Sequence, residues 1–247
     1  EPLLRVVKQK KMPLITVNSG TQQQSESVGA IMHVGQPELF AGEMAGEKAR
    51  RANIHSFVCL NHYASNASSH ERCKGFANGL GPNAKAVTLE LDGDPTAIQA
   101  KIAKYLEEHS DTEAMLALGP TSAVPAIEAL KTLKTGKTPY FATFDLSPQI
   151  SAGIRSGVVA FAIDQQPYLQ AYLPVAILVE YLKKPDASLD SLDSIKVGAY
   201  VNPKLSERMA AYDLDLLASK GRHINSGPAF VTKINIGKVD QYSGSYR

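Results

Sequence analysis

The feature that most constrains the fold is a regular alternation of short apolar runs and longer helical patterns between residues 55 and 163. Short apolar runs bounded by turn residues predict buried strands. Such runs lie at His55–Leu60, Ala86–Leu91, Ala114–Leu118, Tyr140–Phe144 and Val158–Ile163. Helical patterns lie between them at Ser69–Asn78, Thr96–Glu108, Ser122–Leu133 and Pro148–Ser156. This order predicts βαβ units, a mainly parallel sheet flanked by helices and therefore an α/β fold.

The flanking sequence extends the pattern on both sides. Leu14–Val17 and Ala30–Val34 are predicted strands, and Glu38–Ala52 is helical by composition. Near the other end, Lys196–Tyr200 is a candidate strand and Pro203–Lys220 has helical spacing. Helix starts are also readable inside the alternation. Asp94-Pro95 and Ser147-Pro148 each place a capping side chain directly before a proline, which favours the first helical position.

Composition and missing motifs exclude several classes of function. The net charge of +2 over 247 residues argues against a nucleic-acid partner, and no apolar run reaches the roughly 18 residues of a membrane span. There is no dinucleotide or P-loop glycine motif, no G-x-S-x-G nucleophile and no H-E-x-x-H zinc motif. We therefore expect a binding protein and not an enzyme, with no cofactor and no metal.

Two cysteines are present, Cys59 in a predicted strand and Cys73 in the helix that follows. Two cysteines alone do not supply the four ligands of a structural zinc site. A disulfide and two free thiols both stay open, because the distance between the two residues decides and the sequence does not give it.

Polar residues follow the predicted strands at the point where each ends. In an open parallel sheet, ligands bind beyond the carboxyl ends of the strands. Carboxylates and amides can each bond two neighbouring hydroxyls, which suits a polyhydroxylated ligand. For any single position, a helix cap or turn former is the simpler reading. The five groups are Asn61-His62-Tyr63, Asp92-Gly93-Asp94, Gly119-Pro120-Thr121, Asp145 and Asp164-Gln165-Gln166.

Longer motifs resemble a known family. They are MPLITVNSG, HVGQPELFAGEMAGEKA, RCKGFANGL, LALGPTSAVPAIEAL, ATFDLSPQISAGIRSGVVAFAIDQQPYLQAYLPV and GPAFVTK, spread over about Met12–Lys233. Together they resemble the type I periplasmic solute-binding proteins, in the ribose- and galactose-binding branch near members for inositol-like ligands. The resemblance implies two α/β lobes joined by three crossovers, with a monosaccharide or polyol in the cleft between them. It also implies a periplasmic or extracellular protein that delivers the sugar to an ABC permease or a chemoreceptor.

The resemblance implies ligand roles for particular residues. Arg72 in RCKGF matches the arginine that bonds sugar hydroxyls, and its planar fork suits vicinal oxygens. Asp145 in FDLSP matches the acceptor of two hydroxyls, and Gln165 in IDQQP matches the amide at the last crossover. Two positions depart from the pattern: Asn18 stands where relatives often carry aspartate, and Gly119 where they carry a polar side chain. Either the backbone or Thr121 could replace the side chain missing at 119. The weaker candidates from the same strand ends are Asn61, His62 and Asp94.

The resemblance also implies how the chain divides. The N-terminal lobe is expected at residues 1–35 plus 166–228, and the C-terminal lobe at 36–165 plus 229–247. Only Glu1–Lys11 precedes MPLITVNSG, where family members carry further strand–helix units. At about 30 residues a unit, roughly 60–90 residues of the first lobe are expected to be missing. Three explanations stay open. The chain is a fragment, the missing part is unidentified or disordered, or the protein is short and a partner chain completes its lobe. An incomplete lobe predicts poor solubility or self-association.

Three alternatives share this fold class or these residues. The first is the effector domain of a sugar-responsive transcriptional regulator, which has the same architecture and differs by its DNA-binding headpiece. The second is a fragment of a solute-binding protein that no longer binds sugar. The third is an enzyme that uses Asp145 or Asp94 as its base, and it lacks every supporting motif named above.

Overall fold

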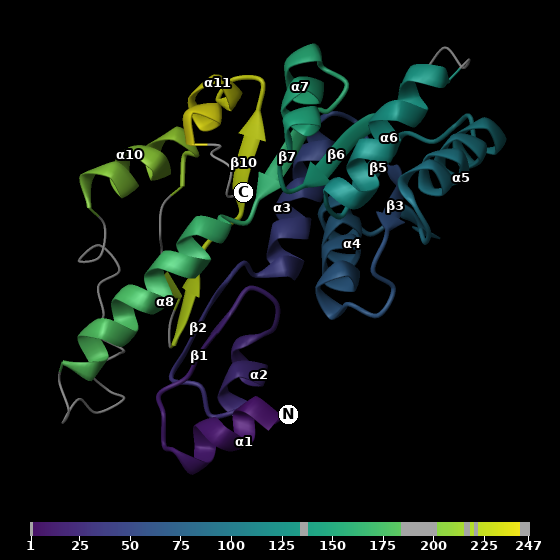
Figure 1. Ribbon diagram of the computed structural model, residues 1–247. Coiled ribbons are helices and arrows are strands. Elements are labelled where there is room, and N and C mark those ends of the chain that lie inside the picture. The colour runs from purple at the N-terminus through teal and green to yellow at the C-terminus, as the bar shows by residue number, and fades with distance from the viewer. Residues whose placement is uncertain (1, 134–137, 184–201, 215–217, 220–221, 243–247) are drawn as a thin grey trace. The chain divides into compact units, whose positions relative to one another are not determined.

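The computed structural model describes residues 2–133, 138–183, 202–214, 218–219 and 222–242 (Figure 1). Contacts divide the chain into two units, and the chain passes from one unit to the other three times. Unit 1 is formed by residues up to Pro37 and by Gln165–Pro228, and unit 2 by Glu38–Asp164 and the chain from Ala229 on. That unit 1 corresponds to the expected N-terminal lobe, and unit 2 to the expected C-terminal lobe, stays a prediction. Each unit is described by itself below.

Unit 1 holds a small sheet with the strand order β1-β2-β9-β8. The strands β1, β2 and β9 are parallel, and β8 is antiparallel to β9. Helix α8 packs its Leu169, Leu173 and Ile177 into a core with strand residues such as Val34 and Ile224. The elements are α1 Pro2–Gln9, β1 Ile15–Val17, α2 Gln22–Ser27, β2 Met32–Gly35, α8 Pro167–Leu182, α10 Pro203–Ala211, β8 Ala218–Ser219 and β9 His223–Asn225.

Unit 2 holds the alternation that the sequence predicted. Its described strands form a sheet of order β10-β7-β6-β5-β3-β4, parallel except for β10 at one edge. The elements are α3 Glu38–Arg51, β3 Ser56–Asn61, α4 Ala67–Leu80, β4 Lys85–Glu90, α5 Pro95–Glu108, β5 Ala114–Ala117, α6 Pro120–Thr132, β6 Tyr140–Phe144, α7 Pro148–Ser156, β7 Phe161–Asp164, β10 Ala229–Thr232, α11 Ile236–Val239 and the 3₁₀ turn Asp240–Tyr242. The predicted mixed α/β fold with mainly parallel sheets is confirmed.

Helix starts follow the predicted capping chemistry. Asp94 accepts hydrogen bonds from the backbone N–H groups of Thr96 and Ala97 at the start of α5. Ser147 accepts one from Ile150 at the start of α7. In both cases a proline occupies the next position, where its missing N–H group costs nothing. These caps fix where each strand ends and its helix begins.

Helices α3 and α4 lie side by side in unit 2 because glycines let their backbones meet (Figure 1). A Cβ atom added at Gly46 would stand 2.1 Å from the carbonyl oxygen of Phe76, and one added at Gly75 would stand 2.1 Å from that of Leu39. No side chain fits at such distances. The close approach presents Glu38, at the start of α3, to Arg72 on α4.

The helix predicted at Pro203–Lys220 is wrong in its second half. Helix α10 ends at Ala211, and Asp213 adopts a left-handed backbone with φ of 51°. Ala218–Ser219 is instead strand β8, paired with β9. The strand predicted at Lys196–Tyr200 lies outside the described residues. The other strands and helices predicted from the sequence are present, with ends that differ by a few residues.

Cys59 and Cys73 form a disulfide that joins β3 to α4. The bond closes a loop with a sequence separation of 14 residues, and cross-linking a loop of about that length restricts the unfolded chain by about 3 kcal/mol. We expect the Cys59→Ala/Cys73→Ala double variant to lose about 2–3 kcal/mol in urea unfolding. A Ser56→Ala variant on the same strand is the control. An unchanged midpoint for the double variant would show that the bond contributes no net stability.

Candidate functional site

The order of strands in unit 2 locates the place where a ligand site is expected. From β3 the chain moves to β4 on one side and then to β5 on the other. The crevice at such a reversal, beyond the carboxyl ends of the strands, is where open α/β sheets bind ligands. Asn61 ends β3 and His62 follows it, and Leu118-Gly119 follow β5, so these residues border the crevice.

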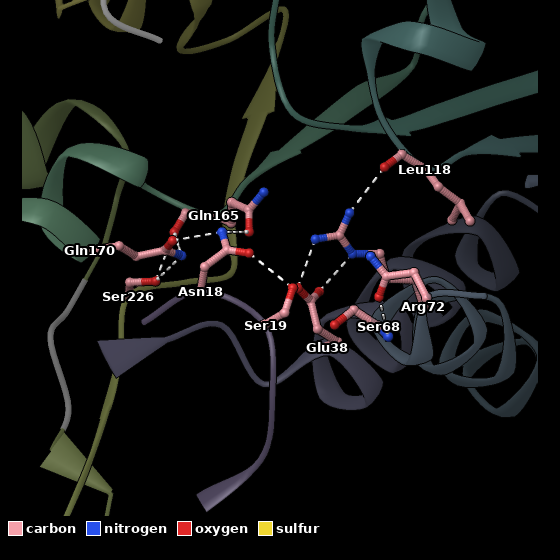
Figure 2. A network of polar contacts seen from close by, with 10 residues as sticks. Asn18, Ser19, Glu38, Ser68, Arg72, Leu118, Gln165, Gln170 and Ser226 are labelled. Carbon is pink, nitrogen blue, oxygen red and sulfur yellow. Dashed lines mark hydrogen bonds and ion pairs between the residues drawn. The ribbon is translucent and has the colours of Figure 1, made fainter. Parts of the chain in front are cut away.

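Arg72 is held rigidly behind this crevice. Its Nε and Nη2 donate to the two carboxylate oxygens of Glu38 at 2.7 Å each, and its Nη1 donates to the Leu118 carbonyl at 3.0 Å (Figure 2). The guanidinium lies 4.3 Å above the ring centre of Phe144. Both charged side chains are buried, with 9% and 2% of their surface exposed. The two parallel bonds to Glu38 fix the plane of the guanidinium.

The charge on Arg72 is maintained by its surroundings. Burial alone lowers the pKa of Arg72, but the hydrogen bonds and negative charge of Glu38, with the charge of Asp145, raise it above its ordinary value. Arg72 therefore stays a cation, and its charge acts on the neighbouring groups of unit 2.

Asp145 comes directly after β6 with a left-handed backbone, φ 61°. Its N–H group donates to the carbonyl of Ile163 on β7 at 2.7 Å. Asp and Asn are the residues that adopt this conformation most readily after Gly. The half-buried carboxylate reaches toward the carboxyl end of β5, because its Oδ2 would lie 3.7 Å from a Cβ atom added at Gly119.

His62 lies on the other side of Gly119. A Cβ atom added at Gly119 would be 3.4 Å from Cε1 of His62 and 3.7 Å from its Nε2. The buried Nδ1 of this imidazole has no hydrogen-bond partner, and the ring packs at 4.4 Å from that of Tyr63. Burial and the nearby charge of Arg72 lower the pKa of His62, so the ring is neutral at pH 7.

Three sequence candidates of unit 2 have other roles in the fold. Asn61 is fully buried, donates from Nδ2 to both carboxylate oxygens of Glu90 and accepts from the Tyr63 backbone. Asp94 is the exposed cap of α5. Thr121 is exposed in the first turn of α6. Their ligand roles stay predictions, while Arg72, Asp145 and Gly119 gather at one edge of the sheet.

In unit 1, a second polar cluster forms where the chain leaves and re-enters the unit. Asn18 donates from Nδ2 to the side-chain oxygens of Gln165 at 3.2 Å and Gln170 at 2.9 Å (Figure 2). Gln170 and Ser226 each donate to the main-chain carbonyl of Gln165, at 2.9 and 2.7 Å. The amides predicted from the sequence, Asn18 and Gln165, therefore share one network.

Sequence reasoning missed Glu38, Gln170 and Ser226. Glu38 is an ordinary acidic residue in the first turn of a helix, and nothing in its neighbourhood signals burial. Gln170 did carry a signal in the sequence, because it interrupts the apolar run of α8. In the structure this residue is only 5% exposed. A polar side chain at a buried helical position needs a partner.

A hollow of about 380 Å³ lies at the opposite, amino-terminal edge of the sheet in unit 2, lined by His55, Tyr105 and Glu113 among others. Glu113 already accepts from the backbone N–H groups of His55 and Ser56 at 2.6 and 3.0 Å. Arg72, Asp145 and Gly119, which lie at the carboxyl ends of the strands, do not line this hollow. Within the described ranges, no three His, Cys, Asp or Glu residues are placed to hold a metal ion.

None of the helices in the described part of the chain has the length and apolarity to span a membrane. Comparison with known proteins gives a consistent result. A family model described as periplasmic binding protein domain matches residues 1–186. The xylose/arabinose-binding protein XylF of Sulfolobus acidocaldarius is 36% identical over 89 residues, which are 34% of this chain and 22% of that protein.

Solved structures share the fold. A carbohydrate transporter from Acidothermus cellulolyticus 11B, in complex with myo-inositol, has a TM-score of 0.76 and 26% identity, over 98% of this chain and 73% of that one. AraP, an arabinose-binding protein from Geobacillus stearothermophilus, has a TM-score of 0.70 and 16% identity, over 98% and 74% of the two chains. Since the family model spans most of the sequence, the chain belongs to the periplasmic binding protein domain family, which confirms the resemblance to type I sugar-binding proteins that its motifs carry.

Proposed function

We propose that this chain binds a monosaccharide or polyol, such as a pentose, a hexose or an inositol-like cyclitol, and releases it chemically unchanged. The observation that carries the proposal is the cluster of Arg72, Asp145, His62 and Gly119 at the strand reversal of unit 2. Arg72 supplies a cation fixed by Glu38, and Asp145 supplies a carboxylate acceptor beside it. A carboxylate can accept from two adjacent hydroxyls, the pattern that sugars present.

The relatives favour the same class of ligand. The Acidothermus cellulolyticus protein was solved with myo-inositol, and the Sulfolobus acidocaldarius protein is named for xylose and arabinose. All three ligands are neutral and rich in hydroxyl groups. The match to the latter covers only about a fifth of its length, so its sugars enter here as candidates for the binding panel below.

The biological role that we propose is delivery of this sugar to an ABC permease, with delivery to a chemoreceptor as the alternative. A periplasmic or extracellular location fits this role. The Cys59–Cys73 bond supports the location, because disulfides persist in oxidising compartments. Closure of two lobes around the sugar, and self-association of the chain, stay predictions.

A thermal-shift panel with myo-inositol, D-xylose, L-arabinose, D-ribose and D-glucose tests the proposal. A ligand at about 100 times its Kd stabilises the folded protein by about 2.7 kcal/mol, which raises Tm by several degrees. We expect at least one sugar to do so, and the Asp145→Asn variant to lose most of that shift. Asparagine keeps the left-handed backbone and removes the charge. Asp92→Asn, at an exposed carboxylate, is the matched control.

Two results would contradict the proposal. One is a wild-type protein whose Tm does not respond to any sugar of the panel. The other is an Asp145→Asn variant that keeps the full shift, which would move the site away from this edge of the sheet.

A further inference from the structure

We propose that Gln170 is a positioning residue, which holds the side chain of Asn18 so that Asn18 offers a ligand an acceptor and no donor. This inference rests on the proposed function and goes further, because it adds a residue of α8 to the site and assigns a polarity to Asn18. The ligand group that fits at Asn18 is therefore a hydrogen-bond donor, such as a sugar hydroxyl, and not a carbonyl or a carboxylate.

The hydrogen bonds around Gln170 have a fixed direction, because they begin at a group that can only accept. That group is the main-chain carbonyl of Gln165, which accepts from Nε2 of Gln170 at 2.9 Å and from the hydroxyl of Ser226 at 2.7 Å (Figure 2). Nε2 of Gln170 also donates to Oγ of Ser226 at 2.9 Å. A carbonyl oxygen has no hydrogen to give, so the nitrogen end of the Gln170 amide faces it.

The orientation of Gln170 determines that of Asn18. The oxygen end of the Gln170 amide, Oε1, faces Asn18 and accepts from its Nδ2 at 2.9 Å. The second hydrogen of Nδ2 is donated to Oε1 of Gln165 at 3.2 Å. The main-chain N–H group of Asn18 donates to the carbonyl of Val34 at 3.0 Å. An asparagine has no donors besides these, so Asn18 has none left for a ligand.

The atom that Asn18 can still offer is its side-chain oxygen. Oδ1 accepts from the hydroxyl of Ser19 at 3.0 Å, and an amide oxygen has a second lone pair for another donor. Asn18 is exposed and directly follows Val17, the last residue of β1. It therefore lies at the carboxyl end of a parallel strand, where α/β sheets bind their ligands. A ligand hydroxyl can donate to Oδ1 there.

Burial makes Gln170 the residue that fixes this arrangement. Gln170 and Ser226 are buried, whereas Asn18 is exposed. If the Gln170 amide turned over, its oxygen would face the Gln165 carbonyl and its nitrogen would face Nδ2 of Asn18. That orientation would leave buried polar groups unpaired, which is costly. Without Gln170, the exposed amide of Asn18 could rotate and present its nitrogen to the ligand.

The first test is NMR of the side-chain amide groups without any sugar. In the ¹⁵N-labelled wild type, the NH₂ protons of Asn18 are expected to exchange with water roughly 10-fold more slowly than those of the exposed Asn83, because both are hydrogen-bonded. In Gln170→Leu, the Asn18 protons should exchange nearly as fast as those of Asn83. Equal rates for Asn18 and Asn83 in the wild type would overturn the proposed orientation.

The second test is a double-mutant cycle, measured by calorimetric titration with the sugar of the panel that stabilises the wild type most. Asn18→Ala removes the acceptor, so affinity should fall roughly 10-fold. Gln170→Leu should cause a similar loss in the wild type, and no further loss when residue 18 is already alanine. Gln22→Leu is the matched control, because the same substitution in unit 1 breaks the bond from Gln22 to Glu26 instead. Its affinity should equal that of wild type.

A merely structural role of Gln170 would lower affinity equally in both backgrounds, and that result would overturn the inference. Wild-type affinity, within about threefold, in either single variant would also overturn it. If Gln170→Leu does not fold, Asn18→Ala and the NMR comparison within the wild type decide the outcome. These results leave the proposed function intact, whereas a wild-type protein that binds no sugar of the panel would overturn both.

Discussion

Replacement of Arg72 by alanine is expected to destabilise the protein by about 3–5 kcal/mol, in addition to abolishing sugar binding. The guanidinium is the partner of both carboxylate oxygens of Glu38, whose side chain is 2% exposed. Removing one member of a buried ion pair leaves the other charge without compensation, and that uncompensated charge carries most of the cost. Urea unfolding of Arg72→Ala beside wild type measures the loss.

A double variant separates this structural effect from the loss of binding. In Glu38→Leu/Arg72→Met both charges are replaced by apolar groups, and such replacements of buried pairs are often neutral for stability. We expect the double variant to recover most of the stability that Arg72→Ala loses, without recovering any sugar-induced shift. If Arg72→Ala and the double variant were equally unstable, the unpaired Glu38 would not be the cause. If the double variant bound sugar, Arg72 would have no role in the site.

Stability is expected to fall by about 3 kcal/mol in acid because of a buried histidine pair in unit 1. His33 on β2 and His223 on β9 are register partners with ring centres 4.8 Å apart, and both are buried. Burial, and then the proximity of His223, lower the pKa of His33 from 6.5 to about 4. The unfolded chain therefore takes up this proton at higher pH than the folded protein. Stability from His33 is complete above pH 6.5 and declines as the pH falls toward 4 and below.

Urea unfolding of the wild type and of His33→Asn between pH 7.5 and 4 measures this decline. Asparagine supplies a polar atom where Nδ1 of His33 meets Thr16 at 2.8 Å, and it does not titrate in this range. We expect His33→Asn to show a smaller loss than wild type over the interval. His70→Gln, at an exposed histidine that contacts the Ala64 carbonyl, is the control and should follow the wild type. Parallel curves for wild type and His33→Asn would exclude His33 as the cause.

The alternation of strands and helices in unit 2 was predictable because its inner strands β3, β5, β6 and β7 are buried on both faces, whereas β4 at the edge is largely exposed. Val58, Leu60 and Leu116 are fully buried, so the strands appear in the sequence as continuous apolar runs. The end of α10 was not predictable in this way. The apolar spacing continues past Asp213, whereas the chain leaves the helix there through a left-handed residue. The spacing of apolar residues predicts which side chains face the core. It does not predict where the backbone turns out of the helix.

Part of the candidate site was predictable, since strand ends in a parallel sheet share one edge and motifs marked Arg72 and Asp145. The partners of these residues were not, because they depend on contacts between distant elements. Glu38 meets Arg72 only because the glycines of α3 and α4 let the two helices approach. His62 was among the weaker candidates, and its position across Gly119 from Asp145 depends on the strand order β6-β5-β3.

The central claim is that a sugar binds at the carboxyl edge of the sheet in unit 2, and backbone NMR tests it most directly. In ¹⁵N-labelled protein titrated with the most stabilising sugar of the panel, the amide signals of His62, Gly119 and Asp145 are predicted to shift in a saturable manner. The amides of His55 and Glu113, which line the hollow at the opposite edge, should stay in place. Saturable shifts at His55 and Glu113, with His62, Gly119 and Asp145 unchanged, would contradict the claim.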